Sequence, residues 1–110
     1  MAERSRLNRA AARKVRNFAC YLRERGLNIE KVFLFGSHAQ RMNRTWSDID
    51  VCIISPQFTD GFDSWAYLWQ SRRPEDVDAM IAPVGFHPDD FVDEEPLVAE
   101  IKLTGVEIEI

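Results

Sequence analysis

Residues 36–50 read Gly-Ser-His-Ala-Gln-Arg-Met-Asn-Arg-Thr-Trp-Ser-Asp-Ile-Asp, and an apolar run lies on either side of them. The run before them is Val32–Phe35, and the run after them is Val51–Ile54. Short runs rich in β-branched and aromatic residues are typical of buried strands. We therefore expect one strand at Lys31–Phe35 and a second strand at Ser47–Ile54, with a turn between them.

The segment that joins these strands carries residues suited to bind phosphate and metal. Gly36 ends the first strand, and a glycine there lets the backbone approach a ligand closely. If Ser37 begins a short helix through Met42, its hydroxyl and the amide groups of the first turn form a phosphate cradle. Asp48 and Asp50 are two positions apart on a strand, so both carboxylates leave one face, roughly 6.6 Å apart along it. Two oxygen ligands beside such a cradle predict a Mg²⁺–triphosphate site.

The order Gly-Ser, ten residues, Asp-x-Asp resembles the nucleotidyltransferase superfamily with the polymerase-β-like catalytic fold. More narrowly, Phe35-Gly-Ser-x-Ala39 and Ser47-Asp-Ile-Asp-Val51 are similar to the minimal nucleotidyltransferase (MNT) group, often encoded beside HEPN-domain proteins as antitoxins. The resemblance implies one domain over residues 1–110, an α/β fold in which a mixed sheet is packed with helices. Gln40 departs from the Arg or Lys usual in the family, and Arg41 is the neighbouring basic side chain that we expect at the phosphate.

The resemblance also implies a third acid on a strand next to the Asp-x-Asp pair. The alternation of Asp76-Val-Asp-Ala-Met-Ile81 predicts a third strand, in which Asp78 matches that acid and Asp76 is the second choice. Converging carboxylates repel one another unless cations lie between them. We therefore expect Asp48, Asp50 and Asp78 to hold two Mg²⁺ ions, with ATP as the nucleotide donor.

In the HEPN-associated group, the MNT protein transfers AMP from ATP to a tyrosine of the HEPN ribonuclease toxin and so neutralises it. The resemblance implies this activity and this partner here. Two alternatives stay open. One is a non-catalytic antitoxin that only covers its HEPN partner, which the departures at Gln40 and Arg41 allow. The other is a small-molecule adenylyltransferase of the aminoglycoside type, although such enzymes usually carry a further domain.

Charge is unevenly distributed in this chain of 110 residues, whose net charge is −4. Residues 1–25 hold eight basic and two acidic residues, and residues 26–110 hold six basic and sixteen acidic ones. The acidic remainder argues against stable nucleic-acid binding. No apolar run reaches the roughly 20 residues of a membrane span. Cys20 and Cys52 have no metal-binding spacing and are typical of a reduced, cytoplasmic protein.

Three further helices and a final strand complete the expected fold. Apolar spacing predicts a helix over residues 5–25, capped by Gly26. A helix from Asp60–Asp63 to about Arg73 should turn these residues toward the core: Phe62, Trp65, Ala66 and Trp69. A last helix begins at Pro96 and ends near Gly105, and these residues should face inward: Leu97, Val98, Ile101 and Leu103. Residues 106–110 alternate as an edge strand.

Overall fold

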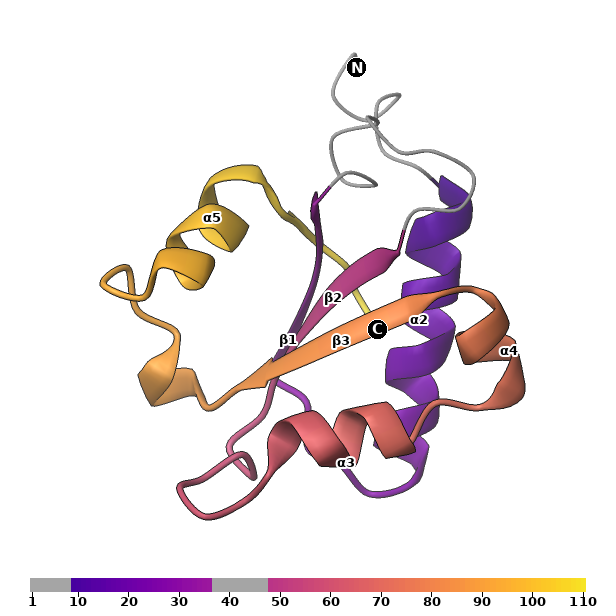
Figure 1. Ribbon diagram of the computed structural model, residues 1–110, viewed down its shortest axis with the longest axis horizontal. Coiled ribbons are helices and arrows are strands. Elements are labelled where there is room, and N and C mark those ends of the chain that lie inside the picture. The colour runs from indigo at the N-terminus through magenta and orange to yellow at the C-terminus, as the bar shows by residue number, and fades with distance from the viewer. Residues whose placement is uncertain (1–8, 37–47) are drawn as a thin grey trace.

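The computed structural model of the protein describes residues 9–36 and 48–110. Its elements in chain order are α2 (Arg9–Glu24), β1 (Lys31–Phe35), β2 (Ile49–Ile54), α3 (Ser64–Gln70), α4 (Pro74–Asp78), β3 (Ile81–Phe86), the 3₁₀ turn η2 (Pro88–Asp90), α5 (Pro96–Thr104) and β4 (Val106–Glu107) (Figure 1). Within those two ranges, no helix combines the length and the apolar character needed to cross a bilayer.

The four strands form one sheet in the order β3-β2-β1-β4. β1 runs antiparallel to both β2 and β4, whereas β2 and β3 are parallel. A parallel pair needs a crossover, and α3 and α4 supply it between β2 and β3. The α/β fold with a mixed sheet, expected from the sequence, is confirmed.

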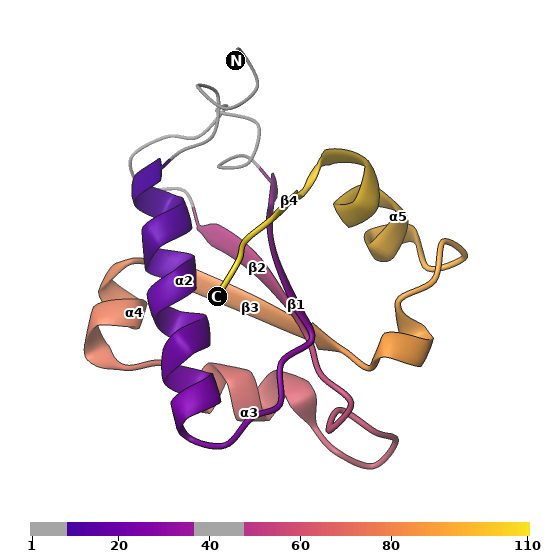
Figure 2. The ribbon, with the colours of Figure 1, turned by 180° about the vertical axis from the view of Figure 1, so that it is seen from behind.

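Helices cover both faces of the sheet, with α2, α3 and α4 on one face and α5 on the other (Figures 1 and 2). Alternate residues of β2 separate accordingly, because successive side chains of a strand point to opposite faces. Ile49, Val51 and Ile53 pack with α2 and α3 in the larger core. Cys52 and Ile54 pack with Ile101 of α5 in the smaller one.

The first helix and its cap follow the sequence expectation. The buried face of α2 consists of Ala11, Ala12, Val15, Phe18, Ala19 and Leu22. Gly26 has φ +105°, a left-handed conformation that glycine adopts without penalty, and the amide of Leu27 donates to the carbonyl of Leu22 over 3.1 Å. The part of the predicted helix before Arg9 lies outside the described residues.

The predicted strand at 76–81 is wrong, since Pro74–Asp78 forms helix α4 and the third strand is Ile81–Phe86. Pro74 occupies the first turn, where its missing N–H costs nothing. The carboxylate of Asp76 accepts a hydrogen bond from the backbone N–H of Arg73 over 2.9 Å and so caps the helix. The alternating acids therefore start a helix, and the strand begins only after them.

Strand β3 lies at an edge of the sheet and contains Pro83, a residue confined to such edges. Side chains of the preceding crossover cover its outer carbonyl groups. Trp69 Nε1 donates to the carbonyl of Pro83 over 3.0 Å, and an Arg72 nitrogen donates to the carbonyl of Ile81 over 3.3 Å. These contacts protect the edge against pairing with another chain.

The inward face predicted for α3 is wrong for Phe62 and Trp65, whereas Ala66 and Trp69 are half-buried. Leu68 is the residue of α3 that is buried, whereas Trp65 is 61% exposed. Phe62, just before the helix, is 43% exposed. In α5, Val98 and Ile101 are buried as predicted, but Leu103 is 84% exposed. The predicted apolar face of α3 is therefore only partly buried.

Candidate functional site

Both ends of the segment 36–50 meet at one end of the sheet. Gly36 directly follows β1, Asp48 directly precedes β2, and Asp50 is the second residue of β2. The antiparallel register sets Phe35 opposite Asp50, which brings Gly36 to the start of β2. The proposed phosphate ligands Ser37 and Arg41 lie outside the described residues.

Gly36 and Asp50 are in close contact. Gly36 has φ +76°, which L side chains rarely adopt. A Cβ built at this position would overlap Oδ2 of Asp50, so the carboxylate occupies the space that any larger residue would fill. Asp50 is half-buried and Asp48 is exposed. The site therefore combines a glycine backbone at residue 36 with two carboxylates, of which that of Asp48 is more exposed to solvent than that of Asp50.

Cys52 follows Asp50 on the same face of β2, but it cannot act as a ligand there. Its side chain is completely buried among the residues under α5. Burial raises the pKa of the Cys52 thiol from its ordinary 9.0 to about 12. Because metals and electrophiles react with the thiolate, this protonated thiol is part of the core.

The strand beside Asp50 presents no acid. In the parallel register of β2 and β3, Asp50 lies next to Ala82. The residues that follow Ala82 at alternate positions, Val84 and Phe86, pack in the smaller core under α5, so Ala82 shares the face of Asp50. From end to end, β3 reads Ile-Ala-Pro-Val-Gly-Phe.

Asp78 was predicted on a strand beside Asp50 and is found instead as an exposed residue at the end of helix α4. Ala79, which caps α4, packs against the larger core, and α4 lies with α2 on the face opposite to Asp50 (Figure 2). The strand placement on which its role was based is therefore wrong.

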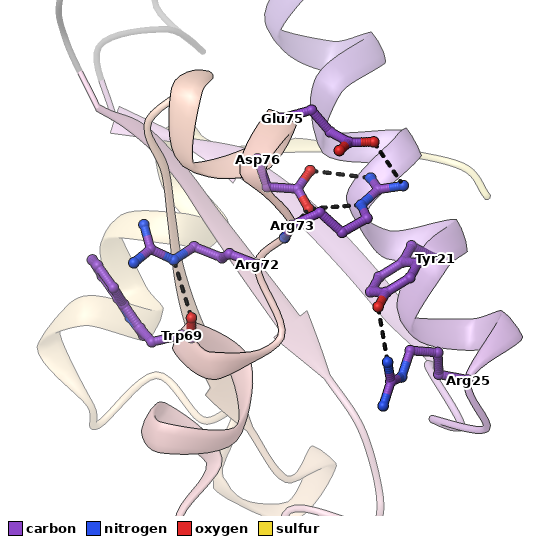
Figure 3. Close-up of polar contacts among 7 residues, drawn as sticks. All are labelled: Tyr21, Arg25, Trp69, Arg72, Arg73, Glu75 and Asp76. Carbon is purple, nitrogen blue, oxygen red and sulfur yellow. Dashed lines mark hydrogen bonds and ion pairs between the residues drawn. The ribbon is translucent and has the colours of Figure 1, made fainter.

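Asp76, the second choice, is 3% exposed and is bound to Arg73 (Figure 3). Arg73 Nε lies 2.9 Å from one carboxylate oxygen and a terminal nitrogen lies 3.1 Å from the other. This hydrogen bonding raises the pKa of the guanidinium. The same guanidinium stacks over the ring of Tyr21 at 4.5 Å and so ties α4 to α2. Asp76 has a structural role.

A groove of about 380 Å³ runs between α2 and α4, with Lys14, Tyr21, Arg73 and Asp76 among its walls. It lies on the helical face that carries Asp76 and includes neither Asp48 nor Asp50. Its volume alone therefore does not mark it as the site of chemistry, and the carboxylates at the start of β2 remain the better candidate.

The donor set at the start of β2 fits one divalent cation held together with phosphate. Mg²⁺ commonly uses one or two carboxylates and completes its shell with phosphate oxygens and water. Across residues 9–36 and 48–110, no group of three or more His, Cys, Asp or Glu side chains is arranged to hold a metal. The expected group of Asp48, Asp50 and Asp78 is absent from this part of the structure, whereas Asp48 and Asp50 lie two residues apart at the start of β2.

Sequence comparison places the chain in a known family. The family described as the nucleotidyltransferase domain matches residues 15–106, well over half of the chain. Among curated proteins, none matches the chain. The matched region runs from α2 to the start of β4 and contains Gly36, Asp48 and Asp50. The chain belongs to the nucleotidyltransferase domain family.

Proposed function

We propose that this domain transfers AMP from ATP to a hydroxyl group of a partner protein, and that the partner is a HEPN ribonuclease toxin. The observation that supports nucleotide transfer most directly is the contact between Gly36 and the carboxylate of Asp50, two residues after Asp48. A backbone free of a side chain beside two carboxylates suits a triphosphate that arrives with a divalent cation.

In the proposed reaction, the acceptor oxygen attacks the α-phosphorus of ATP and forms a new P–O bond. The bond from the α-phosphorus to the bridging oxygen breaks, pyrophosphate leaves with the electron pair, and the hydroxyl proton passes to solvent. Asp48 and Asp50 would hold a divalent cation, which would neutralise charge on the triphosphate. The chain's own residues contribute position: Gly36 leaves room for the carboxylate of Asp50, and the two carboxylates would orient the triphosphate through the cation.

The choice of acceptor rests on the resemblance to the HEPN-associated group and on charge. Exposed basic residues follow the solvent face of α2: Arg9, Arg13, Lys14, Arg16 and Arg23. Such a face favours an acidic partner surface and speeds encounter with it.

Co-expression with a HEPN-type partner tests the proposal, with the intact mass of the partner as the readout. Wild type should add one or more AMP units, and Asp48→Ala should add none. Asp78→Ala is the matched control, because Asp78 is an exposed acid on the opposite helical layer, and it should retain the modification. An unmodified partner in the presence of wild type would refute transfer.

A non-catalytic antitoxin is the second candidate, and Ala82 is the observation that favours it. A site with two carboxylates can bind a nucleotide and still lack what activates an acceptor. This function would be identified if wild type and Asp48→Ala both inhibit the partner and the mass of the partner does not change.

A further inference from the structure

We infer that the site of this chain holds one divalent cation, on the nucleotide side, and that Ala82 stands where a third carboxylate would be needed for a second. The inference rests on the proposed function, since it concerns the same site. It departs from the expectation of two Mg²⁺ ions.

The register of the sheet places Ala82 beside Asp50. Asp50 and Ala82 are partners in the parallel ladder of β2 and β3, and neighbouring strands lie about 4.8 Å apart. The next partners on this face, Cys52 with Val84 and Ile54 with Phe86, are packed together in the smaller core. A carboxylate at position 82 would therefore stand beside that of Asp50, and a methyl group stands there instead.

Among residues 9–36 and 48–110, no His, Cys, Asp or Glu side chain completes a group of three metal ligands with Asp48 and Asp50. Asp76 is held by Arg73, and Asp78 is exposed on α4, across the sheet from Asp50. In the parts of the sequence that the structure leaves undescribed, residues 37–47 contain neither Asp nor Glu, and residues 1–8 contain Glu3 alone. The joining segment 37–47 thus cannot supply the missing carboxylate.

A site with one cation has a consequence for the acceptor. A second cation favours the ionised form of the attacking oxygen. Without it, a tyrosine hydroxyl with a pKa near 10 keeps its proton at neutral pH. Transfer should therefore be slow at pH 7 and rise about tenfold per pH unit toward that pKa.

The number of bound cations tests the inference without relying on activity. Mn²⁺ bound per chain is measured by equilibrium dialysis at saturating non-hydrolysable ATP analogue. We expect one Mn²⁺ for wild type and two for Ala82→Asp. Ala82→Asn is the matched control, because it adds nearly the same volume without charge, and it should bind one. Circular dichroism of the two variants shows whether each is folded.

Two Mn²⁺ ions bound to wild type would overturn this inference and leave the proposed function standing. The wild-type result decides even if Ala82→Asp does not fold. A folded Ala82→Asp that still binds one ion would also overturn the assignment of position 82. Failure of wild type to bind any Mn²⁺ with the analogue would refute the nucleotide site itself, and with it the proposed function.

Discussion

The carboxylate of Asp50 occupies the space in which a Cβ of residue 36 would lie. Gly36 is therefore required twice, once by its φ of +76° and once by the side chain opposite. The first requirement concerns stability, because a left-handed alanine costs about 1 kcal/mol. The second concerns the site, because Asp50 must move if the space is filled.

Gly36→Ala should weaken the binding of Mg²⁺–ATP at least about tenfold, in addition to its cost in stability. Gly61→Ala is the matched control, since Gly61 has φ +86° and open space around its Cβ position. The control should lose similar stability and keep its affinity. Isothermal titration calorimetry measures the affinities, and equal losses in the two variants would contradict a special role for Gly36.

Asp48→Asn together with Asp50→Asn should abolish stabilisation by Mg²⁺–ATP, because the triphosphate loses the cation that links it to the protein. At a ligand concentration 100 times Kd, binding adds about 2.7 kcal/mol, which raises Tm by on the order of 10 °C in a domain of this size. Thermal unfolding with and without Mg²⁺–ATP measures the difference. Equal shifts in wild type and the double variant would place the nucleotide elsewhere.

The sequence predicted the parts of the fold in which local pattern and tertiary packing agree. Strand Lys31–Phe35 appears with its predicted bounds, and Gly26 and Gly105 end their helices. Asp48 and Asp50 could be found because their spacing is carried by a single strand, β2.

The third strand was not predicted at Ile81–Phe86 because the sequence pattern there is untypical of a strand and the pattern just before it is typical of one. Pro83 and Gly85 weaken the strand pattern of β3, and they are tolerated there because β3 is an edge. Asp76 and Asp78 alternate with apolar residues as in a strand. However, the backbone N–H of Arg73 donates a hydrogen bond to the carboxylate of Asp76 and stabilises a helical turn. This hydrogen bond involves the side chain of Asp76 in a helical turn that begins at Pro74, and hydrophobic periodicity does not predict such a side-chain contact.

The inward face of α3 could not be predicted for a related reason. The helix is apolar on more than one side, so its pattern does not choose a face. Contacts with the edge strand β3 determine which side of α3 faces inward. Trp69 donates a hydrogen bond to the carbonyl of Pro83, and Leu68 packs in the larger core. Trp65 is then left outside, stacked on Trp69 at 5.5 Å.

Cys52 should make the protein lose stability in alkali. The pKa of the folded thiol is about 12 against an ordinary 9.0, so the folded state retains a proton that the unfolded state releases. Stability from this group is therefore complete below pH 9 and is lost as the pH rises toward 12, by up to about 1.4 kcal/mol per pH unit.

Urea unfolding at several pH values above 9 measures this loss. Cys52→Ala should show a shallower decline than wild type, whatever its stability at pH 7. Cys20→Ala is the control, because Cys20 is only half-buried, and its decline should match that of wild type. Parallel declines in wild type and Cys52→Ala would show that the thiol does not control alkaline unfolding.

The last prediction separates the two acids of α4. Asp76→Asn keeps the size of the side chain but removes the charge that receives the guanidinium of Arg73. The hydrogen bonds of a charged group to a buried partner contribute on the order of 2 kcal/mol. The Arg73 side chain is 25% exposed, so solvent can compensate for part of this loss. Asp78→Asn, on the exposed side of the same helix, should change stability by less than about 0.5 kcal/mol.

Both variants should retain the thermal shift with Mg²⁺–ATP and the transfer of AMP, because neither acid lies at the start of β2. Urea unfolding followed by tryptophan fluorescence gives the stabilities, and the mass of the modified partner gives the transfer. If Asp78→Asn is stable but no longer transfers AMP, then Asp78 takes part in the reaction. That result would also require α4 to leave its place beside α2, since in this structure the guanidinium of Arg73 joins the two helices through Tyr21.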